Sequence, residues 1–268
     1  MNFDERDLYA GLASLHWSAI SDTDSRWDQA FYKDIIQQNG GQALELGCGA
    51  GRLLLAYLQE GLDVEGVDIS GDMLAVCREA AEAAGLHPVL YEQPMQLLDL
   101  PHRFSTIYVP CGSFVCVMDR AAALETLRRC HAHLVPGGVL AFNIYLTDHD
   151  YSRQTEPGPF PRPWKKKAEK QLSGGRRLMV YYRETGLDPV EQIWMEERRY
   201  QLYAAERLIQ EETRGGQGRW YFRNEVLWML QLAGFSDVVV KGDYTDEDFD
   251  ADHKQTMVFI ATKDAALD

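Results

Sequence analysis

The stretch best suited to ligand chemistry is Ala43 to Gly51, ALELGCGAG. Glycines at 47, 49 and 51 follow a short apolar strand and precede a helix that begins near Arg52. Glycine lets a ligand approach the backbone closely, and the free N–H groups at the start of a helix attract a negative group. A second apolar strand ends in Asp68, and an acidic residue at that position hydrogen-bonds ribose hydroxyls. Together these residues predict a nucleoside site.

The glycine spacing differs from that of a dinucleotide-binding loop. The dinucleotide fingerprint is GxGxxG, whereas this chain has Arg52 where the third glycine would fall. The loop therefore lacks the glycine spacing with which a dinucleotide-binding loop accommodates a pyrophosphate. Taken alone, the glycines are also compatible with a tight strand-to-helix turn that binds nothing, but the acidic residue after the second strand favours a ligand site.

The two motifs, ELGCGAGR and VEGVDIS, resemble the first two motifs of the class I S-adenosylmethionine (SAM)-dependent methyltransferases. The resemblance implies SAM as the cofactor and S-adenosylhomocysteine (SAH) as its product. By the same resemblance Glu45 lies beneath the methionine end, Gly47 to Gly51 pass under the cofactor, and Asp68 binds the ribose. The cofactor site implied in this way also includes Cys48, Ile69, Met73, Pro110 and Cys111.

Two parts of this site stay open at the level of sequence. Arg52 either pairs with the methionine carboxylate or is a surface arginine. The family usually has an acidic residue after the third strand that accepts a hydrogen bond from the adenine amino group, and Pro94 stands there in this chain. Either Gln93 or Glu92 takes that role, or the adenine is held by apolar contact and the Met95 backbone.

The strands and helices that position these residues predict an α/β fold. Apolar stretches at 43–46, 64–67, 89–91, 104–109, 139–145, 238–240 and 257–260 alternate with helical patterns, which is typical of an open sheet. The resemblance adds a Rossmann-like, doubly wound sheet of seven strands with the last strand antiparallel. We assign residues 40–150 and 219–268 to this domain, with helices expected at 120–134 and after a cap at Asn224.

The segments outside that domain are expected to cover the site. Residues 1–39 predict a helical lid, with Trp27, Phe31 and Ile35 four residues apart. Residues 151–218 predict an antiparallel β insertion with strands at 176–184, 192–203 and 205–213 and a turn at 185–189. The insertion either covers the substrate side or pairs with a second subunit in a homodimer.

Composition narrows the class of partner. The net charge of −14 over 268 residues argues against a protein whose main task is binding nucleic acid. The segment 153–177 is locally basic and is either a solvated face or a contact for an anionic substrate or partner. No apolar run is long enough to span a membrane and the acidic start is unlike a leader, so we expect a cytoplasmic protein.

Metal and disulfide chemistry are not expected. The five cysteines are odd in number and form no CxxC pair, which favours neither a disulfide framework nor a zinc site. No His, Asp or Glu spacing indicates a metal.

Methyl transfer from SAM depends chiefly on placing a nucleophile and excluding water, so a catalytic base is optional. His149 is the best general base on titration grounds, although a lone loop histidine can simply be solvated. Tyr9 and Tyr145 are the other catalytic candidates. In the resembled family a tyrosine and a later aromatic residue form part of the lid over SAM. Tyr9 matches the first and is therefore also expected to bind the cofactor, whereas His16 and Trp17 stand where the second would be. The substrate candidates are His16, Trp17, Ser113, Asn143, Arg219 and Trp220.

The leading hypothesis is therefore methyl transfer to a small-molecule acceptor, at nitrogen or oxygen and less readily at carbon. Three rivals stay open: a nucleotide-dependent oxidoreductase, a non-catalytic SAM-binding module that uses the insertion as an interaction surface, and a methyltransferase acting on RNA or protein. PCGSF after the fourth strand, in place of an Asn-Pro-Pro-Tyr motif, disfavours methylation of nucleobase amines.

Overall fold

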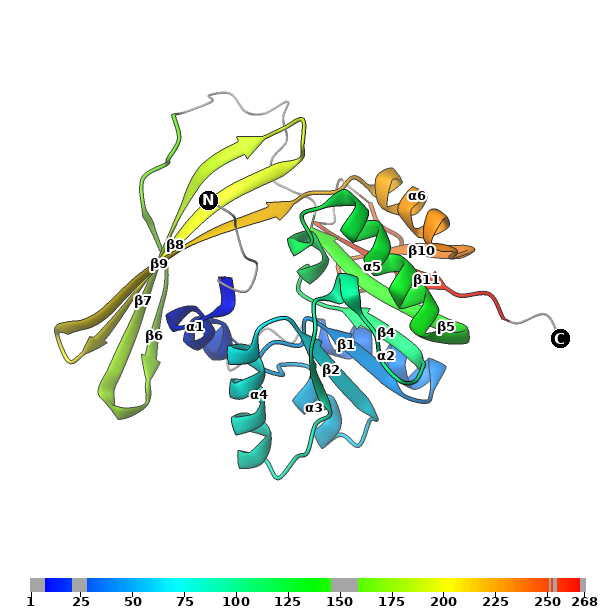
Figure 1. The fold of residues 1–268 in the computed structure, drawn as a ribbon, viewed down its shortest axis with the longest axis horizontal. Helices are drawn as coiled ribbons and strands as arrows, with labels where there is room; N and C mark the ends of the chain where they lie inside the picture. Colours follow the sequence, from blue (N-terminus) through cyan, green and yellow to red (C-terminus); the bar gives the residue numbers. More distant parts are fainter. Residues whose placement is uncertain (1–7, 21–27, 146–158, 251, 253–254, 266–268) are drawn as a thin grey trace.

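The computed structural model describes residues 8–20, 28–145, 159–250, 252 and 255–265. The chain forms a seven-stranded sheet with helices on both faces and a separate four-stranded antiparallel sheet beside it (Figure 1). The large sheet has the order β10-β11-β5-β4-β1-β2-β3. Its strands are β1 (Ala43–Leu46), β2 (Val64–Asp68), β3 (Leu90–Glu92), β4 (Phe104–Val109), β5 (Leu134–Tyr145), β10 (Asp237–Gly242) and β11 (Thr256–Thr262).

The central strands of this sheet are apolar because both faces are covered by helices. Strand β1 is buried along its whole length and pairs in parallel with β2 and β4, so the carboxyl ends of all three strands meet at one edge. Strand β11 runs antiparallel to both β5 and β10. The predicted α/β fold with an antiparallel last strand is confirmed.

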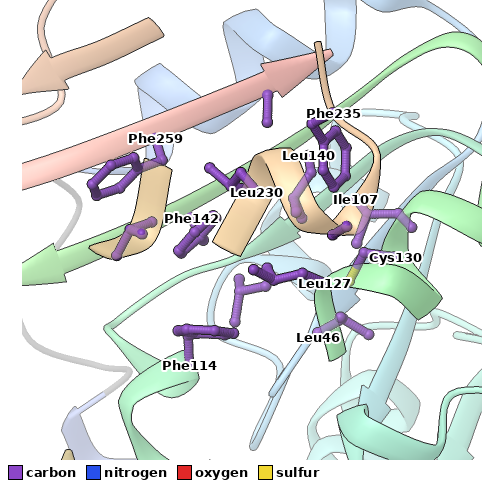
Figure 2. Packing of buried hydrophobic residues seen from close by; sticks show 14 of the residues in the cluster. Leu46, Ile107, Phe114, Leu127, Cys130, Leu140, Phe142, Leu230, Phe235 and Phe259 are labelled. Carbon is purple, nitrogen blue, oxygen red and sulfur yellow. The ribbon is translucent and has the colours of Figure 1, made fainter. Parts of the chain in front are cut away.

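Two cores, one on each face, hold the helices to the sheet. On one face α5 (Arg120–His133) and α6 (Arg223–Ala233) pack against β1, β4, β5 and β11. In Figure 2, Leu127 and Cys130 of α5 and Leu230 of α6 lie close to Leu140 and Phe142 of β5. The opposite face carries α2 (Gln29–Asn39), α3 (Leu54–Gln59) and α4 (Gly71–Ala83).

Several element ends differ from the predicted ones. Strand β3 runs from Leu90 to Glu92 instead of 89–91, and β5 begins at Leu134, before the predicted start at 139. Helix α6 begins at Arg223, two residues earlier than a cap at Asn224 allows. Its cap is Phe222, whose N–H donates to the Glu225 carboxylate, and that bond satisfies an N–H that the helix itself leaves free.

The insertion contains four strands, one more than predicted. They are β6 (Lys165–Leu172), β7 (Arg176–Asp188), β8 (Ile193–Ala204) and β9 (Arg207–Arg219), paired in that order. The predicted turn at 185–189 is wrong for residues 185–188, which continue β7 after a register shift near Gly186. The chain turns after Asp188, whose carboxylate accepts the N–H groups of Val190 and Glu191.

Strand β6 accounts for much of the basic segment 153–177. It lies at the edge of the insertion sheet and carries exposed Lys165, Lys166 and Lys167. Lysines on an edge strand oppose pairing with another chain. Lys166 also pairs with Glu169 at 2.6 Å, so part of the local charge is neutralised within the strand.

The N-terminal segment forms two helices with different positions. Helix α1 (Leu12–Ile20) buries Leu12 and Ala13 against Leu178 and Tyr200 of the insertion sheet, and lies between that sheet and α4 (Figure 1). Helix α2 belongs to the core of the large sheet. Trp27 lies outside the described residues. Among the described helices, none combines the length and the apolar character needed to span a membrane.

Candidate active site

A cavity of about 420 Å³ lies between the carboxyl edge of the large sheet and the insertion sheet. Residues at the ends of β1, β2 and β4 form one side, and residues of β8 and β9 form the other. Most of the predicted site residues line it: Tyr9, Trp17, Glu45, Gly47, Cys48, Gly49, Arg52, Asp68, Ile69, Met73, Gln93, Pro94, Met95, Pro110, Cys111, Ser113, Tyr145, Arg219 and Trp220. His16, Gly51 and Asn143 do not line it, and His149 lies outside the described residues.

The glycine loop is shaped by backbone angles that favour glycine. Gly47, Gly49 and Gly51 have φ values of 72°, 53° and 85°. A Cβ at Gly47 would lie 2.9 Å from the Ser113 side chain, and one at Gly49 would lie 3.1 Å from Met73. At Gly51 the added atom would meet Cys77 at 2.6 Å. Gly47 and Gly49 therefore keep the cavity wall open, whereas Gly51 serves local packing.

We expect Gly47→Ala to weaken SAH binding by about tenfold, because the added methyl group displaces Ser113 at the cavity wall. Gly40→Ala is the matched control, since Gly40 also has a positive φ of 61° but open space where its Cβ would be. Calorimetric titration measures the SAH affinity of both variants. Both substitutions place a side chain at a positive φ, but only the one at Gly47 also crowds a neighbouring side chain. Equal losses of affinity in the two variants would contradict this role for Gly47.

Asp68 ties the end of β2 to the glycine loop. Its Oδ2 accepts the Gly49 N–H at 2.8 Å and its Oδ1 accepts the Ser70 N–H at 2.8 Å. The residue is 8% exposed. Burial raises the pKa of this carboxyl group, and the backbone hydrogen bonds oppose that rise. Each oxygen keeps a further lone pair that can accept a hydrogen bond from a ligand in the cavity.

Glu45 is buried at the end of β1, where the Tyr108 hydroxyl donates to its Oε2 at 2.8 Å. Burial raises the pKa of Glu45 to about 8, against the opposing effects of the Tyr108 hydrogen bond and the Arg52 charge. A cationic group bound beside Glu45 would favour its ionised form.

This carboxyl group makes stability depend on pH. Glu45 titrates near 4.5 when the chain is unfolded and near 8 when it is folded, so the folded protein holds the proton more tightly. We therefore expect the free energy of unfolding to fall as pH rises between these values, by at most about 1.4 kcal/mol per pH unit for one proton. Urea unfolding of wild type and Glu45→Gln across this range checks it, and equal slopes would contradict the prediction.

Arg52 pairs with a residue that sequence analysis missed. Its Nη1 and Nη2 donate to the two carboxylate oxygens of Asp28 at 2.7 and 2.6 Å, and Nη2 also lies 3.0 Å from Cys111 Sγ. The Asp28 side chain is 0% exposed and that of Arg52 is 15% exposed. The alternative of a surface arginine is therefore wrong. Asp28 is far from the glycine loop in sequence, and nothing in the residue pattern marks it.

The adenine end implied by the family resemblance is mainly apolar. The Gln93 amide is already engaged, since its two ends bond the backbone C=O and N–H of Asp99. Pro94, Met95 and Gln96 line the cavity beside it, and Glu92 is exposed and does not. This arrangement favours the alternative in which apolar contacts and the backbone at Met95 hold the ring.

The aromatic residues of the N-terminal segment divide between the cavity and the packing of the insertion. Tyr9 and Trp17 both line the cavity, with ring centroids 5.7 Å apart, and the Tyr9 hydroxyl lies 3.5 Å from Cys116 Sγ. His16 is buried against Trp17 and Tyr200 instead. Burial, followed by the Arg198 charge, lowers the pKa of His16 to about 4, so His16 is a packing residue with a neutral ring.

The predicted residues at the ends of β4 and β5 have separate tasks. Asn143 is buried and accepts the Gly112 N–H at 2.9 Å, which fixes the loop after β4. Ser113 lines the cavity while its hydroxyl donates to the Pro110 carbonyl. Burial raises the pKa of Tyr145 to about 12, so its hydroxyl stays protonated at neutral pH and is a donor rather than a base.

The insertion side of the cavity contains residues that sequence analysis did not select. Trp194, Glu196 and Arg198 line it from alternate positions of β8, and Glu196 pairs with Arg198 at 2.7 Å. Trp194 and Glu196 pair with Gly218 and Gly216 of β9, and a Cβ at Gly218 would overlap the Trp194 ring. The alternation along QIWMEERRY could have indicated a shared face, but not that this face borders the cavity.

Comparisons with known proteins agree with this geometry. Residues 43–138 match the family model described as a methyltransferase domain. A putative methyltransferase of Geobacillus sp. strain WCH70 is 30% identical over 123 residues, which is 44% of this chain and 50% of the relative. The chain thus spans about half the length of the curated relatives it matches.

Two solved structures share the fold. An S-adenosylmethionine-dependent methyltransferase from Clostridium acetobutylicum aligns with a TM-score of 0.73 at 17% identity, over 92% of this chain and 94% of the other. A sugar N-methyltransferase from Streptoalloteichus sp. aligns with a TM-score of 0.68 at 18% identity, over 93% and 92%. The coverage includes most of the chain, so the insertion sheet belongs to the shared architecture.

Proposed function

We infer, from the premise that residues 43–138 form a methyltransferase domain in a fold shared with a SAM-dependent methyltransferase, that this chain transfers a methyl group from SAM to a small-molecule acceptor. The acceptor atom is nitrogen or oxygen, and less readily carbon. The observation that carries the proposal is a continuous cavity that joins the glycine loop and Asp68 to the inner face of the insertion sheet. Such a cavity has space for a cofactor and an acceptor in contact.

The residues of the sheet edge fit SAM. The cavity wall at Gly47 and Gly49 would be obstructed by a Cβ, Asp68 is buried and faces the cavity, and Glu45 offers a carboxyl group to a cation. When bound, SAM supplies a methyl group on a good leaving group. Asp68 then accepts hydrogen bonds from the ribose, and Glu45 lies toward the methionine end with Arg52 held by Asp28.

The catalytic contribution proposed for the protein is positioning and the exclusion of water. The insertion sheet closes the cavity opposite the glycine loop, and Tyr9 and Trp17 narrow it from the N-terminal segment. Orientation of this kind contributes about 7–11 kcal/mol to a barrier, more than the roughly 3–5 kcal/mol of a general base. Tyr145 is protonated at neutral pH, which favours an acceptor that needs no strong base, such as an amine.

The rival functions have less support. In the basic segment, Lys166 pairs with Glu169, and Arg177 pairs with Glu169 and Glu206. That neutralisation and the net charge of −14 disfavour RNA as the acceptor. The insertion lies over the cavity, which favours a role in covering the substrate. Its pairing with a second subunit stays a prediction.

The test is methyl transfer with labelled SAM to a library of amines, phenols and carboxylic acids, run beside titration with SAH and with NAD(H). We expect saturable SAH binding, no NAD(H) binding, and label in at least one small acceptor. Tight NAD(H) binding without SAH binding would favour the oxidoreductase, and SAH binding with no transfer to any acceptor would favour the non-catalytic module.

A further inference from the structure

Arg219 is a buried positive charge at the acceptor side of the cavity. The residue is 4% exposed and lines the cavity from the last position of β9. Its Nε donates to the Met118 carbonyl at 2.8 Å and its Nη1 donates to the Glu191 carbonyl. In the described part of the chain, its Nη2 has no hydrogen bond and the guanidinium has no carboxylate within salt-bridge distance.

The carboxylates nearest to Arg219 in the sequence and the sheet have other partners. Glu191 pairs with Arg120 at 3.0 Å. Glu225 accepts from the Gln192 side chain at 3.0 Å, and Glu196 pairs with Arg198 at 2.7 Å. The other two cavity arginines are both paired, Arg52 with Asp28 and Arg198 with Glu196. Arg219 therefore stands apart as a cavity arginine that the described residues leave without a counter-charge.

We propose that Arg219 binds a carboxylate of the methyl acceptor, so that the acceptor is a small carboxylic acid. The inference rests on the proposed function, because it assigns the acceptor of that same cavity. A buried charge is costly unless a partner of opposite charge reaches it. The acceptor is the ligand expected at the insertion side, and an anion on it would supply that partner.

A carboxylate fits this site better than a phosphate. The two backbone carbonyls take one N–H of Nε and one of Nη1, so three of the five N–H groups of Arg219, two on Nη2 and one on Nη1, are left for an anion. Arginine binds a planar carboxylate through parallel hydrogen bonds of this kind. One positive charge matches one carboxylate, whereas a phosphate carries more charge than a lone arginine offsets. Trp194 and Trp220 line the cavity near Arg219 and provide apolar contact for the rest of the molecule.

The carboxylate of the cofactor is the competing ligand. The two assignments differ in which ligand loses affinity when Arg219 is replaced. If Arg219 held the cofactor, its loss would weaken SAH, which has a carboxylate, but not methylthioadenosine, which lacks the amino-acid part. If Arg219 holds the acceptor, both nucleosides bind the variant as they bind wild type.

The experiment uses protein saturated with SAH and measures the binding of para-aminobenzoate, para-hydroxybenzoate and small aliphatic amino acids. Each acid is compared with its primary amide and with a phosphate ester of similar size. Arg219→Gln and Arg219→Lys are compared with wild type, and Arg223→Gln is the control, because Arg223 is an exposed arginine outside the cavity. Thermal unfolding of each variant confirms that it is folded, and Arg219→Lys keeps the charge if Arg219→Gln does not fold.

We expect at least one acid to bind wild type about tenfold more tightly than its amide, with the preference lost in Arg219→Gln, reduced in Arg219→Lys and kept in Arg223→Gln. Three results with the acids would overturn the inference: acids and amides that bind wild type alike, a preference that survives in Arg219→Gln, or no binding of any acid. A stronger preference for phosphate esters would also overturn it. So would a variant that loses affinity for SAH but not for methylthioadenosine. If the wild-type protein still binds SAH, these results contradict only the role of Arg219 and leave the proposed methyl transfer untouched.

Discussion

Replacing Asp68 by alanine is expected to weaken SAH binding by about 100-fold or more. The carboxylate accepts the Gly49 and Ser70 N–H groups at 2.8 Å and lines the cavity where the ribose is proposed to lie. The variant loses the ribose contact and also the bond that fixes the glycine loop. Hydrogen bonds to a charged group are each worth about 1.5–3 kcal/mol, so losing two of them accounts for the expected change.

Asp63→Ala is the matched control for this experiment. Asp63 immediately precedes β2, at the opposite end of the strand from Asp68, and is exposed. Its loss should change SAH affinity less than twofold. Calorimetric titration measures both variants, and near-wild-type affinity in Asp68→Ala would show that this carboxylate does not bind the cofactor.

The largest effect on stability is expected from Asp28→Ala. Asp28 is fully buried and forms a two-bond ion pair with Arg52, whose side chain is 15% exposed, so removing Asp28 leaves a largely buried arginine without its counter-charge. Breaking a buried pair from one side costs about 3–5 kcal/mol. Urea unfolding should therefore give a free energy of unfolding lower by about that amount.

Two further variants identify the cause. Asp28→Leu combined with Arg52→Met removes both charges and should recover much of the lost stability, because no charge is left alone. Glu60→Ala breaks the solvent-exposed Lys33–Glu60 pair and should lower stability far less than Asp28→Ala does. A double variant no more stable than Asp28→Ala would argue that packing, and not charge, explains the loss.

The large sheet could be predicted from sequence because its signals are local. The glycine loop and the strand that ends in Asp68 each occupy a few consecutive residues, and each lies where predicted. The errors fall where a local signal competes with long-range pairing. Residues 185–188 contain turn-forming types, yet cross-strand bonds to β8 extend β7 through them.

The acceptor side of the site could be predicted only in part. The sequence predicts Arg219 and Trp220 at the substrate side but not Trp194, Glu196 and Arg198, because the role of these three depends on the insertion sheet folding against the glycine loop. The sequence predicts His16 as a substrate contact, whereas in the structure its ring packs from α1 against Trp17 and against Tyr200 of the insertion sheet. Contacts between segments so far apart in sequence carry no local pattern.

The central claim is that the cofactor lies between the glycine loop and Asp68 with its reactive end toward the insertion sheet. A crystal structure of the protein with SAH tests this most directly. We predict the ribose hydroxyls within about 3 Å of the Asp68 carboxylate, the amino-acid part toward Glu45, and the sulfur facing the space bounded by Tyr9 and Trp194. SAH bound elsewhere, or a cavity filled by protein side chains with SAH absent, would contradict the claim.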